Sequence, residues 1–336
     1  MDSNLFSQIN TTIAVKESSF ITVDTFQKML QAANKEELAL LLQATPYQLS
    51  AEELDDLTAI DASLMRELSR EYHWAFAEAP EKTIVTMFSL RYVYHNIKVL
   101  LKNKATGKDL SDLLIPIGEQ SLEALQHMVS ALKSDFFPEF MVEEIRDVWA
   151  EYEDYKDVRV LEIGADLAYF KHLRKIAEQS EVDVFNQAIT LMIDFYNVIT
   201  IKRALRQKKP HSFMLQLLSD DGSLSAREFI DLVEQNDLIS WFNQVNPGIL
   251  EASLVEYEDK IRQGTISVVE LEYLYDLIQF QLLDQARYEV QGPLVLARYL
   301  LGREFEVKNL RLLLSALCND ISLDIVKERM RPIYGQ

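Results

Sequence analysis

The sequence holds few residues whose types and spacing suit catalysis. Glu123 and His127 stand four residues apart, as two zinc ligands on one helix would, but the pattern offers no third ligand. The pair Gly107-Lys108 lacks the upstream glycine and the following Ser or Thr of a phosphate-binding loop. The single cysteine, Cys318, lies in a Leu-rich stretch, which favours a buried, inert thiol over a nucleophile. We therefore predict no catalytic residue, no cofactor and no metal site.

One segment has the pattern of a magnesium site. Asn236–Gln244 reads NDLISWFNQ and resembles the second metal motif of the all-α terpenoid synthases. Gln244 takes the place of a ligating carboxylate, and a neutral amide is a poor Mg²⁺ ligand beside a diphosphate. No Asp-Asp-x-x-Asp run accompanies the segment. We expect an ordinary helix end here, and an all-α enzyme of this kind is the less favoured alternative.

Basic residues gather after three asparagines in an otherwise acidic chain. Asn96, Asn197 and Asn309 each begin an apolar, basic, helix-favouring run, and we expect each asparagine to be a local hydrogen-bonding or packing residue. If the three helices face a common axis, their basic side chains present a ring of positive charge to a polar or acidic protein element. An equally weighted alternative is that basic residues late in a helix complement its dipole. The candidate partner-binding residues are Asn96, Lys98, Lys102, Asn197, Lys202, Arg203, Arg206, Asn309 and Arg311.

The elements that carry these residues are predicted to be helices. Gly (9) and Pro (8) are scarce among 336 residues, and 48% of the residues are apolar, which favours a sizeable helical core. Capping boxes, in which a serine and a glutamate satisfy backbone donors reciprocally, are expected at Ser50–Glu53, Ser225–Glu228 and Ser267–Glu270. Loops are expected at Lys104–Gly107, Gln207–Pro210, Asp220–Gly222 and Asn246–Gly248.

Charge and cysteine content exclude several classes of function. The net charge of −19 disfavours nucleic acid and anionic lipid surfaces, which both need clustered Lys and Arg. We see no apolar stretch near the ~20 residues that span a bilayer and no signal peptide at the N-terminus. A single cysteine is typical of a reducing, cytosolic protein.

The asparagine segments form a long internal repeat. A degenerate fourth copy begins at Asn10, so the order of segments predicts three helical units, at residues 1–107, 108–222 and 223–336. The first and last helices would then complete one another and close a ring. Architectures built from one repeated unit usually bind other molecules rather than catalyse reactions.

The repeat segments resemble a known family, the d subunits of V/A-type rotary ATPases, which are called C subunits in bacteria and archaea. The middle copy departs from the other two, because Ile199 stands where they carry Lys98 and Arg311. The resemblance covers nearly the whole chain and is most specific at its C-terminal end. Its segments are Tyr94–Leu101, Asp194–Asn197, Arg203–Arg206, Gly292–Leu300, Glu304–Leu314 and Glu328–Tyr334.

The resemblance implies an all-α, pseudo-threefold, funnel-like body and a non-enzymatic role. Such a protein sits as a central-stalk socket on the cytoplasmic face of the membrane proteolipid ring, without spanning the membrane. It receives the foot of the central axle, made of subunits of the D and F type, and passes torque to the ring for H⁺ or Na⁺ transport. The other alternative is an all-α helical-repeat scaffold or adaptor of another complex. A regular solenoid has repeats of about 30–50 residues, roughly half the period seen in this chain.

Overall fold

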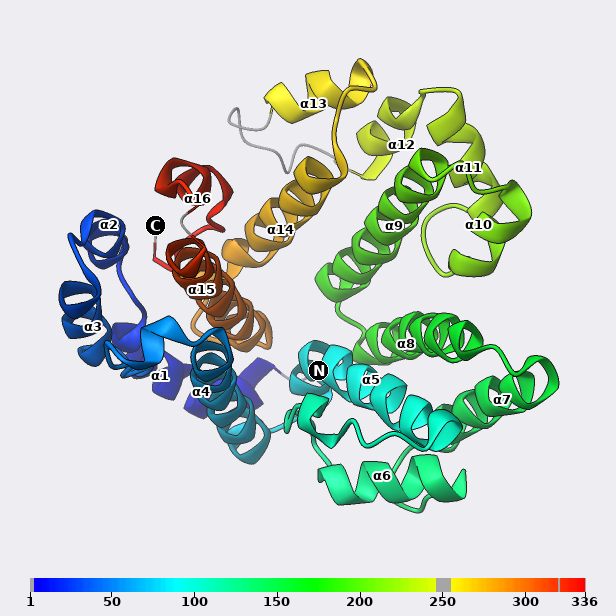
Figure 1. Cartoon of the computed structure of the whole chain (residues 1–336), viewed down its shortest axis with the longest axis horizontal. Coiled ribbons are helices and arrows are strands. Elements are labelled where there is room, and N and C mark those ends of the chain that lie inside the picture. Colours follow the sequence, from blue (N-terminus) through cyan, green and yellow to red (C-terminus); the bar gives the residue numbers. More distant parts are fainter. Residues whose placement is uncertain (1–2, 246–254, 320, 336) are drawn as a thin grey trace. The chain divides into compact units, whose positions relative to one another are not determined.

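The computed structural model describes residues 3–245, 255–319 and 321–335, and every regular element within these ranges is a helix (Figure 1). The all-α prediction is therefore confirmed. The scarcity of Gly and Pro explains it, because few residues interrupt the helical hydrogen-bond ladder. The loop predicted at Asn246–Gly248 lies outside the described residues.

The chain folds into two compact units. Unit 1 comprises Met1–Phe88 and Leu283–Gln336, and unit 2 comprises Ser89–Leu282. Helix α1 packs on α15, so the two ends of the chain lie in the same unit. The three-unit division near residues 107 and 222 and the pseudo-threefold funnel stay predictions.

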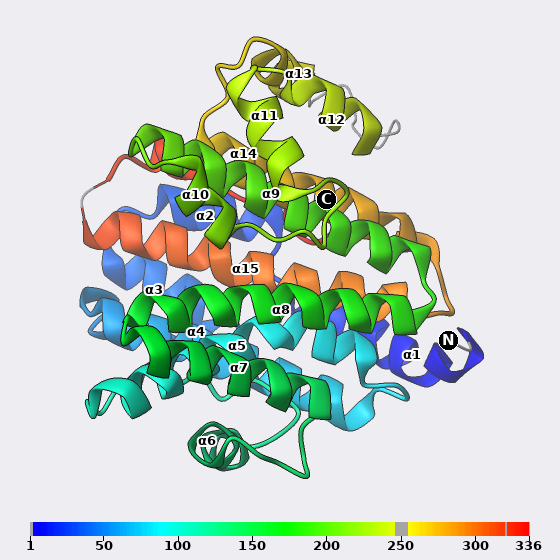
Figure 2. The ribbon, with the colours of Figure 1, turned by 90° about the vertical axis from the view of Figure 1, so that its right-hand side faces the viewer.

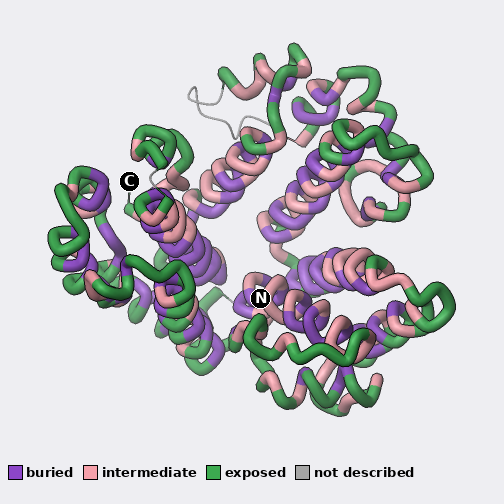
Figure 3. The backbone as a smooth tube through the Cα atoms, in the orientation of Figure 1, coloured by how far each residue is buried: buried purple, intermediate pink, exposed green. Residues whose placement is uncertain are grey.

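Unit 1 is built around helix α15, which packs against α1, α4 and α16. Figure 3 shows most of α15 as buried, and even Arg303, Glu304 and Glu306 within it are buried. The elements of unit 1 are η1 (Ser3–Phe6), α1 (Ser7–Lys16), η2 (Glu17–Ser19), α2 (Val23–Gln31), α3 (Lys35–Gln43), η3 (Glu53–Asp55), α4 (Leu57–Glu78), η6 (Gln285–Tyr288), α15 (Leu294–Cys318) and α16 (Leu323–Arg329).

A buried ion pair within α15 accepts hydrogen bonds from the N-terminal segment and so ties that segment to the helix. The Arg303 guanidinium donates to Glu306 Oε1 over 2.9 Å. Glu306 also accepts hydrogen bonds from the backbone N–H of Ile21 at 2.6 Å and from the Tyr47 hydroxyl at 2.8 Å. Burial raises the pKa of Glu306 and Arg303 opposes this shift, so removal of Arg303 would leave the buried carboxylate without its counter-ion.

Unit 2 is a succession of helices packed on their chain neighbours. Helix α7 runs alongside α8, α8 packs on α9, and α9 packs on α11, while Figure 2 shows α6 crossing the direction of α7. Helices α5 and α14 begin or end in unit 1. The elements are α5 (Thr83–Thr106), η4 (Ser111–Leu113), α6 (Leu122–Ala131), α7 (Glu139–Tyr155), α8 (Val158–Ser180), α9 (Asp183–Arg206), α10 (His211–Leu217), α11 (Ala226–Glu234), α12 (Leu238–Val245), α13 (Val255–Arg262) and α14 (Val268–Asp284).

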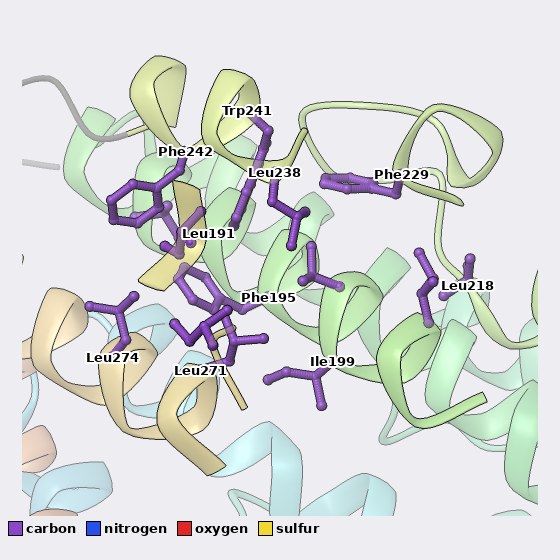
Figure 4. Close-up of a cluster of buried hydrophobic side chains, with 14 of the residues drawn as sticks. Leu191, Phe195, Ile199, Leu218, Phe229, Leu238, Trp241, Phe242, Leu271 and Leu274 are labelled. Carbon is purple, nitrogen blue, oxygen red and sulfur yellow. The ribbon is translucent and has the colours of Figure 1, made fainter. Parts of the chain in front are cut away.

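The apolar core of the second half of unit 2 gathers around α9. Phe195 of α9 meets the Trp241 ring edge-on at 5.3 Å, and Phe229 meets the same ring at 5.8 Å. Leu271 and Leu274 of α14 close the cluster from the other side (Figure 4). This core holds α9 in place, and with it the second asparagine.

The predicted helix starts are confirmed in the form of reciprocal hydrogen bonds. At Ser225–Glu228 and Ser267–Glu270 each serine and glutamate cap the other's backbone N–H, and α11 and α14 begin there. Ser50–Glu53 makes the same pair of bonds but opens the short 3-10 helix η3, not an α-helix.

The loop predicted to begin at Lys104 starts later, because α5 continues to Thr106 and ends at Gly107, whose φ is +66°. The Lys104 ammonium donates to the carbonyls of Val129 and Ser130, both at 3.0 Å, and these contacts hold the last turn of α5 against α6. A tertiary contact thus extends the helix beyond the point at which the sequence alone places its end.

Helix α9 is long and apolar enough to cross a membrane by length and composition, unlike the other helices of the described ranges. The expectation that no stretch approaches this length is therefore wrong for α9. Half of its most apolar window is buried within the protein, as in the core helix of a packed domain. The burial of α9 against α8 and α11 explains its apolar composition.

Candidate functional site

The second asparagine of the repeat clamps a single backbone residue. Asn197 Nδ2 donates to the carbonyl of Ser219 at 2.8 Å, and the N–H of Ser219 donates to Asn197 Oδ1 at 3.0 Å. Both residues are buried. The side-chain amide therefore pairs with the N–H and the C=O of Ser219, as the backbone of an adjacent β-strand would, and satisfies both polar groups of this residue.

The other two asparagines make the same clamp. Asn96 exchanges a pair of bonds of 2.7 and 2.8 Å with the backbone of Ile115. Asn309 does so with the backbone of Arg331, at 3.0 and 2.7 Å. The clamped residue follows its asparagine by 19 residues in the first copy and by 22 in the other two. The predicted local hydrogen-bonding role of these asparagines is confirmed.

Sequence reasoning missed the clamped partners, although two of them carry a signal. Ile115 and Arg331 directly precede Pro116 and Pro332. A residue before proline is pushed into an extended conformation, which turns its N–H and C=O outward for pairing. An asparagine on a helix followed about 20 residues later by such an extended residue is the pattern to look for, although Ser219 lacks the proline.

The fourth, degenerate copy does not form a clamp. Asn10 Nδ2 donates to the carbonyls of Val290 at 3.3 Å and Gly292 at 3.0 Å, some 280 residues away in sequence. Its Oδ1 accepts no hydrogen bond within the described part of the chain. Asn10 therefore ties the N-terminal helix α1 to the loop before α15, which is a different task from that of the other three.

The three clamping amides are buried, and each already bonds the N–H and the C=O of one backbone residue. Asn96, Asn197 and Asn309 are each 1% exposed or less. We therefore assign them a structural role, and the partner-binding role predicted for them, as for the basic residues, stays a prediction. A partner that reached these amides would first have to open the clamped loops.

Four of the candidate basic residues form ion pairs within their own unit. Lys98 and Lys102 pair with Asp166 and Glu162, which lie one turn apart on α8. Arg203 pairs with Glu272 of α14. The side chains of Lys98 and Lys102 are 30% and 32% exposed and that of Arg203 is 57% exposed, so each pair is at least partly in water and contributes about 0–1 kcal/mol.

The fourth ion pair belongs to the third copy of the repeat. It involves the position two residues after the asparagine, where the third copy differs from the second. Arg311 pairs with Asp61 of α4 at 2.7 Å, and Lys98 occupies the same position in the first copy. Ile199, the residue at that position in α9, is buried in the apolar core instead. This position therefore holds a basic residue in an ion pair in two copies and a buried apolar residue in the third.

Lys202 and Arg206 have no ion-pair partner in residues 3–245, 255–319 and 321–335. Burial lowers the pKa of Lys202, while Glu270 opposes this shift only from a distance. A half-buried ammonium group that lacks a close carboxylate is under-compensated, so an incoming acidic group would stabilise it. Arg206 is exposed in the last turn of α9.

A buried carboxylate steadies the loop that follows the Asn197 clamp. Asp194 accepts hydrogen bonds from the N–H of Ser223 at 2.8 Å and from Trp241 Nε1 at 3.0 Å. Burial raises the pKa of Asp194, and these donors oppose the shift. A side chain at Gly222 would lie 2.3 Å from Asp194 Oδ1, so the close approach requires glycine there.

The remaining motifs have structural environments. The described ranges contain no group of three His, Cys, Asp or Glu side chains placed to hold a metal. In the NDLISWFNQ segment, Ser240 Oγ donates to Asp237 Oδ1. Asp237 directly precedes α12, so this bond lies at the N-terminal end of a helix, in agreement with the expected helix end.

Cys318 is half-buried, not fully buried as predicted, and lines a cavity of about 340 Å³ in unit 1. Its thiol donates to the carbonyl of Leu54 at 3.1 Å. Burial raises the pKa of this thiol, which disfavours the reactive thiolate.

Comparison with known proteins identifies the family of this chain. A family model described as ATP synthase (C/AC39) subunit matches residues 9–329. The chain belongs to this family.

Three relatives match more than nine-tenths of the chain. The C subunit of the V-type sodium ATPase of Enterococcus hirae is 31% identical over 330 residues, which are 98% of this chain and 99% of the relative. The C subunit of the V-type ATP synthase of Thermus thermophilus is 26% identical over 329 residues, 92% and 93% of the two chains. The C subunit of the A-type ATP synthase of Pyrococcus abyssi is 20% identical over 346 residues, 96% and 89% of the two chains. The resemblance found in the sequence is thereby confirmed, and the chain is a C subunit of the V/A-type ATP synthases.

Proposed function

We propose that this chain is the non-catalytic rotor component that joins the central axle of a V/A-type rotary ATPase to the membrane proteolipid ring. In this role it lies on the cytoplasmic face of the membrane and passes torque between axle subunits of the D and F type and the ring, for transport of H⁺ or Na⁺. The observation that carries the proposal is the match to the family of ATP synthase C subunits over residues 9–329.

The three clamps support a mechanical role. Each ties a loop to a long, buried helix through two hydrogen bonds at a single residue, as at Asn197 and Ser219. A loop held at both its N–H and its C=O cannot slide along the helix without breaking both bonds. A protein that transmits torque needs joints of this stiffness.

The basic end of α9 is the proposed axle-docking surface. Lys202 and Arg206 have no internal ion-pair partner in the described part of the chain, and Arg203 beside them carries only a surface pair with Glu272. Cations of this kind attract an acidic partner and raise its association rate. The acidic remainder of the chain repels the same partner, which confines docking to this place.

Reconstitution tests the role as a whole. The purified chain is mixed with the axle subunits and, separately, with the detergent-solubilised proteolipid ring, and binding is measured by pull-down and biolayer interferometry. We expect the chain to bind both partners. If it binds neither, the proposal is wrong.

Charge reversal tests the docking surface. The variant Lys202→Glu/Arg206→Glu is expected to weaken axle binding about tenfold at low salt, with a smaller effect at high salt because exposed charges are screened. Adding Arg203→Glu should weaken it further. Arg159→Glu is the matched control, since Arg159 is a surface cation of the same unit that pairs only with its neighbour Asp157. Equal affinity of the double variant and the control refutes the assignment.

A further inference from the structure

The loop before α15 carries the sequence signal of a clamped residue. Two of the three clamped residues, Ile115 and Arg331, directly precede a proline. Gly292 also directly precedes a proline, Pro293, and its C=O accepts a hydrogen bond from the Asn10 amide at 3.0 Å. The pair of Asn10 and Gly292 is therefore a half clamp, in which one of the two bonds of a complete clamp is made.

The second bond of this half clamp is diverted to the N-terminal segment. In a complete clamp the asparagine Oδ1 accepts the N–H of the clamped residue, as Asn197 does from Ser219 at 3.0 Å. The N–H of Gly292 donates instead to the carbonyl of Ser3 in η1, at 3.1 Å. Asn10 is 6% exposed, and its Oδ1 accepts no hydrogen bond within the described part of the chain. A buried acceptor without a donor is costly, so this oxygen favours a rearrangement that brings it an N–H.

The backbone of Gly292 differs from that of the clamped residues. Its φ is +97°, whereas Ile115, Ser219 and Arg331 have no positive φ. A residue before proline prefers an extended conformation with negative φ. Glycine can adopt both conformations because it has no Cβ to clash. A change of φ at Gly292 is therefore the difference between the half clamp and a complete one.

The part of η1 that takes the N–H of Gly292 can leave without opening the core. Residues 3–5 are exposed, whereas Phe6, at the other end of η1, is fully buried. Release of residues 3–5 thus keeps the Phe6 ring in place, and Phe6 marks the point from which the segment swings.

We propose that η1 and the loop before α15 form a two-state device. While η1 is docked, the Ser3 carbonyl holds the N–H of Gly292 and the clamp stays half made. When residues 3–5 leave, Gly292 turns to the extended conformation and donates its N–H to Asn10 Oδ1, which completes a fourth clamp. One hydrogen bond replaces another and the buried acceptor gains a donor, so the release of η1 is partly compensated.

Completion of the clamp alters the loop before α15. In the half clamp Asn10 Nδ2 is shared between the carbonyls of Val290, at 3.3 Å, and Gly292. In the complete clamps both bonds of the asparagine go to one residue, so completion frees the Val290 carbonyl. Docking of η1 and the conformation of this loop are therefore linked, and a ligand that binds one state shifts both.

Hydrogen exchange at the Gly292 amide of the full-length chain tests the device. Glycine is labelled with ¹⁵N and glutamine at its carbonyl carbon with ¹³C, which selects the amides of Gly264 and Gly292, the two glycines that follow a glutamine. The variant Gln263→Glu identifies the Gly264 signal by removing its labelled neighbour. The N–H of Gly264 donates to the carbonyl of Ile261 at 3.0 Å and serves as the internal reference.

The variant Asn4→Pro removes the competing acceptor. Proline pushes the residue before it out of the helical region, so the Ser3 carbonyl turns away from Gly292. The Gly292 amide should exchange within about threefold of the wild-type rate, because its N–H moves to Asn10 Oδ1. In Asn4→Pro/Asn10→Ala neither acceptor is left, and exchange should accelerate at least about 100-fold. Asn4→Ala is the matched control, and Asn10→Ala alone should stay slow because Ser3 still accepts.

A spin label on η1 reports its release independently. Leu5→Cys/Cys318→Ser leaves one thiol, at an exposed position of η1, for a nitroxide. Its spectrum should gain a mobile component in Asn4→Pro but not in Asn4→Ala. A mobile label together with fast exchange at Gly292 in Asn4→Pro overturns the proposal, because η1 then leaves without completing the clamp. Exchange in Asn4→Pro/Asn10→Ala that is no faster than in Asn10→Ala overturns it as well.

The variant Gly292→Ala drives the same change from the loop. Alanine is strained at a φ of +97° but not in the extended conformation, and the nearest atom to the added carbon is Ser3 Oγ at 3.6 Å. The label on η1 should therefore become mobile in this variant. Gly335→Ala is the matched control, because Gly335 has a φ of +87° and no atom within 4 Å of the added carbon. An equally immobile label in both variants overturns the proposal. No partner enters these measurements, so their outcome is separate from that of the proposed function.

Discussion

Removal of the Asn197 amide should measure the strength of one clamp. In Asn197→Ala the N–H and the C=O of Ser219 both lose their partners while Ser219 stays buried. Leaving a buried polar group unpaired costs about 1–3 kcal/mol, so two such groups should lower the free energy of unfolding by about 2–6 kcal/mol. That is a large share of the ~5–15 kcal/mol that stabilises a typical protein.

The measurement is urea unfolding followed by tryptophan fluorescence. Trp241 is buried in the core that packs on α9, so its share of the emission, which Trp74 and Trp149 also contribute to, reports the unfolding of the region that holds the clamp. The exposed Asn319 is the control residue, since its amide bonds only within its own helix end, to Ser315. Asn319→Ala should change the free energy of unfolding by less than about 0.5 kcal/mol.

A second substitution distinguishes the clamp from simple loss of volume. Asn197→Asp keeps the size of the side chain but removes the donor to Ser219 and places a carboxylate against its carbonyl. It should therefore destabilise the protein at pH 7 at least as much as Asn197→Ala does. A loss below about 1 kcal/mol for Asn197→Ala, or wild-type stability of Asn197→Asp, would refute the reasoning about buried backbone groups.

Two further predictions concern a buried histidine and the buried ion pair of α15. Burial lowers the pKa of His172 to about 4 from its usual 6.5, so the folded protein keeps the ring neutral while the unfolded chain takes up a proton. This group should not affect the free energy of unfolding above pH 6.5, and it should lower it by up to roughly 3 kcal/mol as the pH drops from 6.5 toward 4. In urea unfolding across this range, the free energy of unfolding should fall less steeply for His172→Gln than for the wild type. An equally steep fall would contradict the assignment. Arg303→Met should lower the free energy of unfolding by about 3–5 kcal/mol because Glu306 is left buried and unpaired. The double variant Arg303→Met/Glu306→Gln should recover part of that loss in the same assay, and no recovery would show that charge is not the cause.

The sequence predicted the helical class, the family resemblance and the asparagine repeat. These follow from local information: scarce Gly and Pro, serine–glutamate pairs three residues apart, and segments that recur along the chain. Ser225–Glu228 is an example, because both halves of its capping box lie within one turn of the chain. Such features need no knowledge of what packs on them.

The prediction of the candidate site was right about the asparagines' local role and incomplete about the basic residues. Lys98, Lys102 and Arg311 look like free cations in the sequence, whereas their acidic partners lie between 60 and 250 residues away. No local pattern marks an acid at that separation as a partner. Lys202 looks equivalent to Arg203, yet only the packing around α9 leaves Lys202 half-buried without a close carboxylate.

What the sequence determined by itself is therefore the all-helical class, the repeat and the family to which the chain belongs. The tertiary structure decided which groups are engaged and which are available. The three asparagines each bond a clamped loop, and Asn10, their counterpart in the degenerate copy, bonds the loop before α15 instead. The physical reason is that a hydrogen bond or ion pair depends on the distance and direction between two groups. Sequence order fixes these only within a turn or two of helix, and beyond that range the packing of the core sets them.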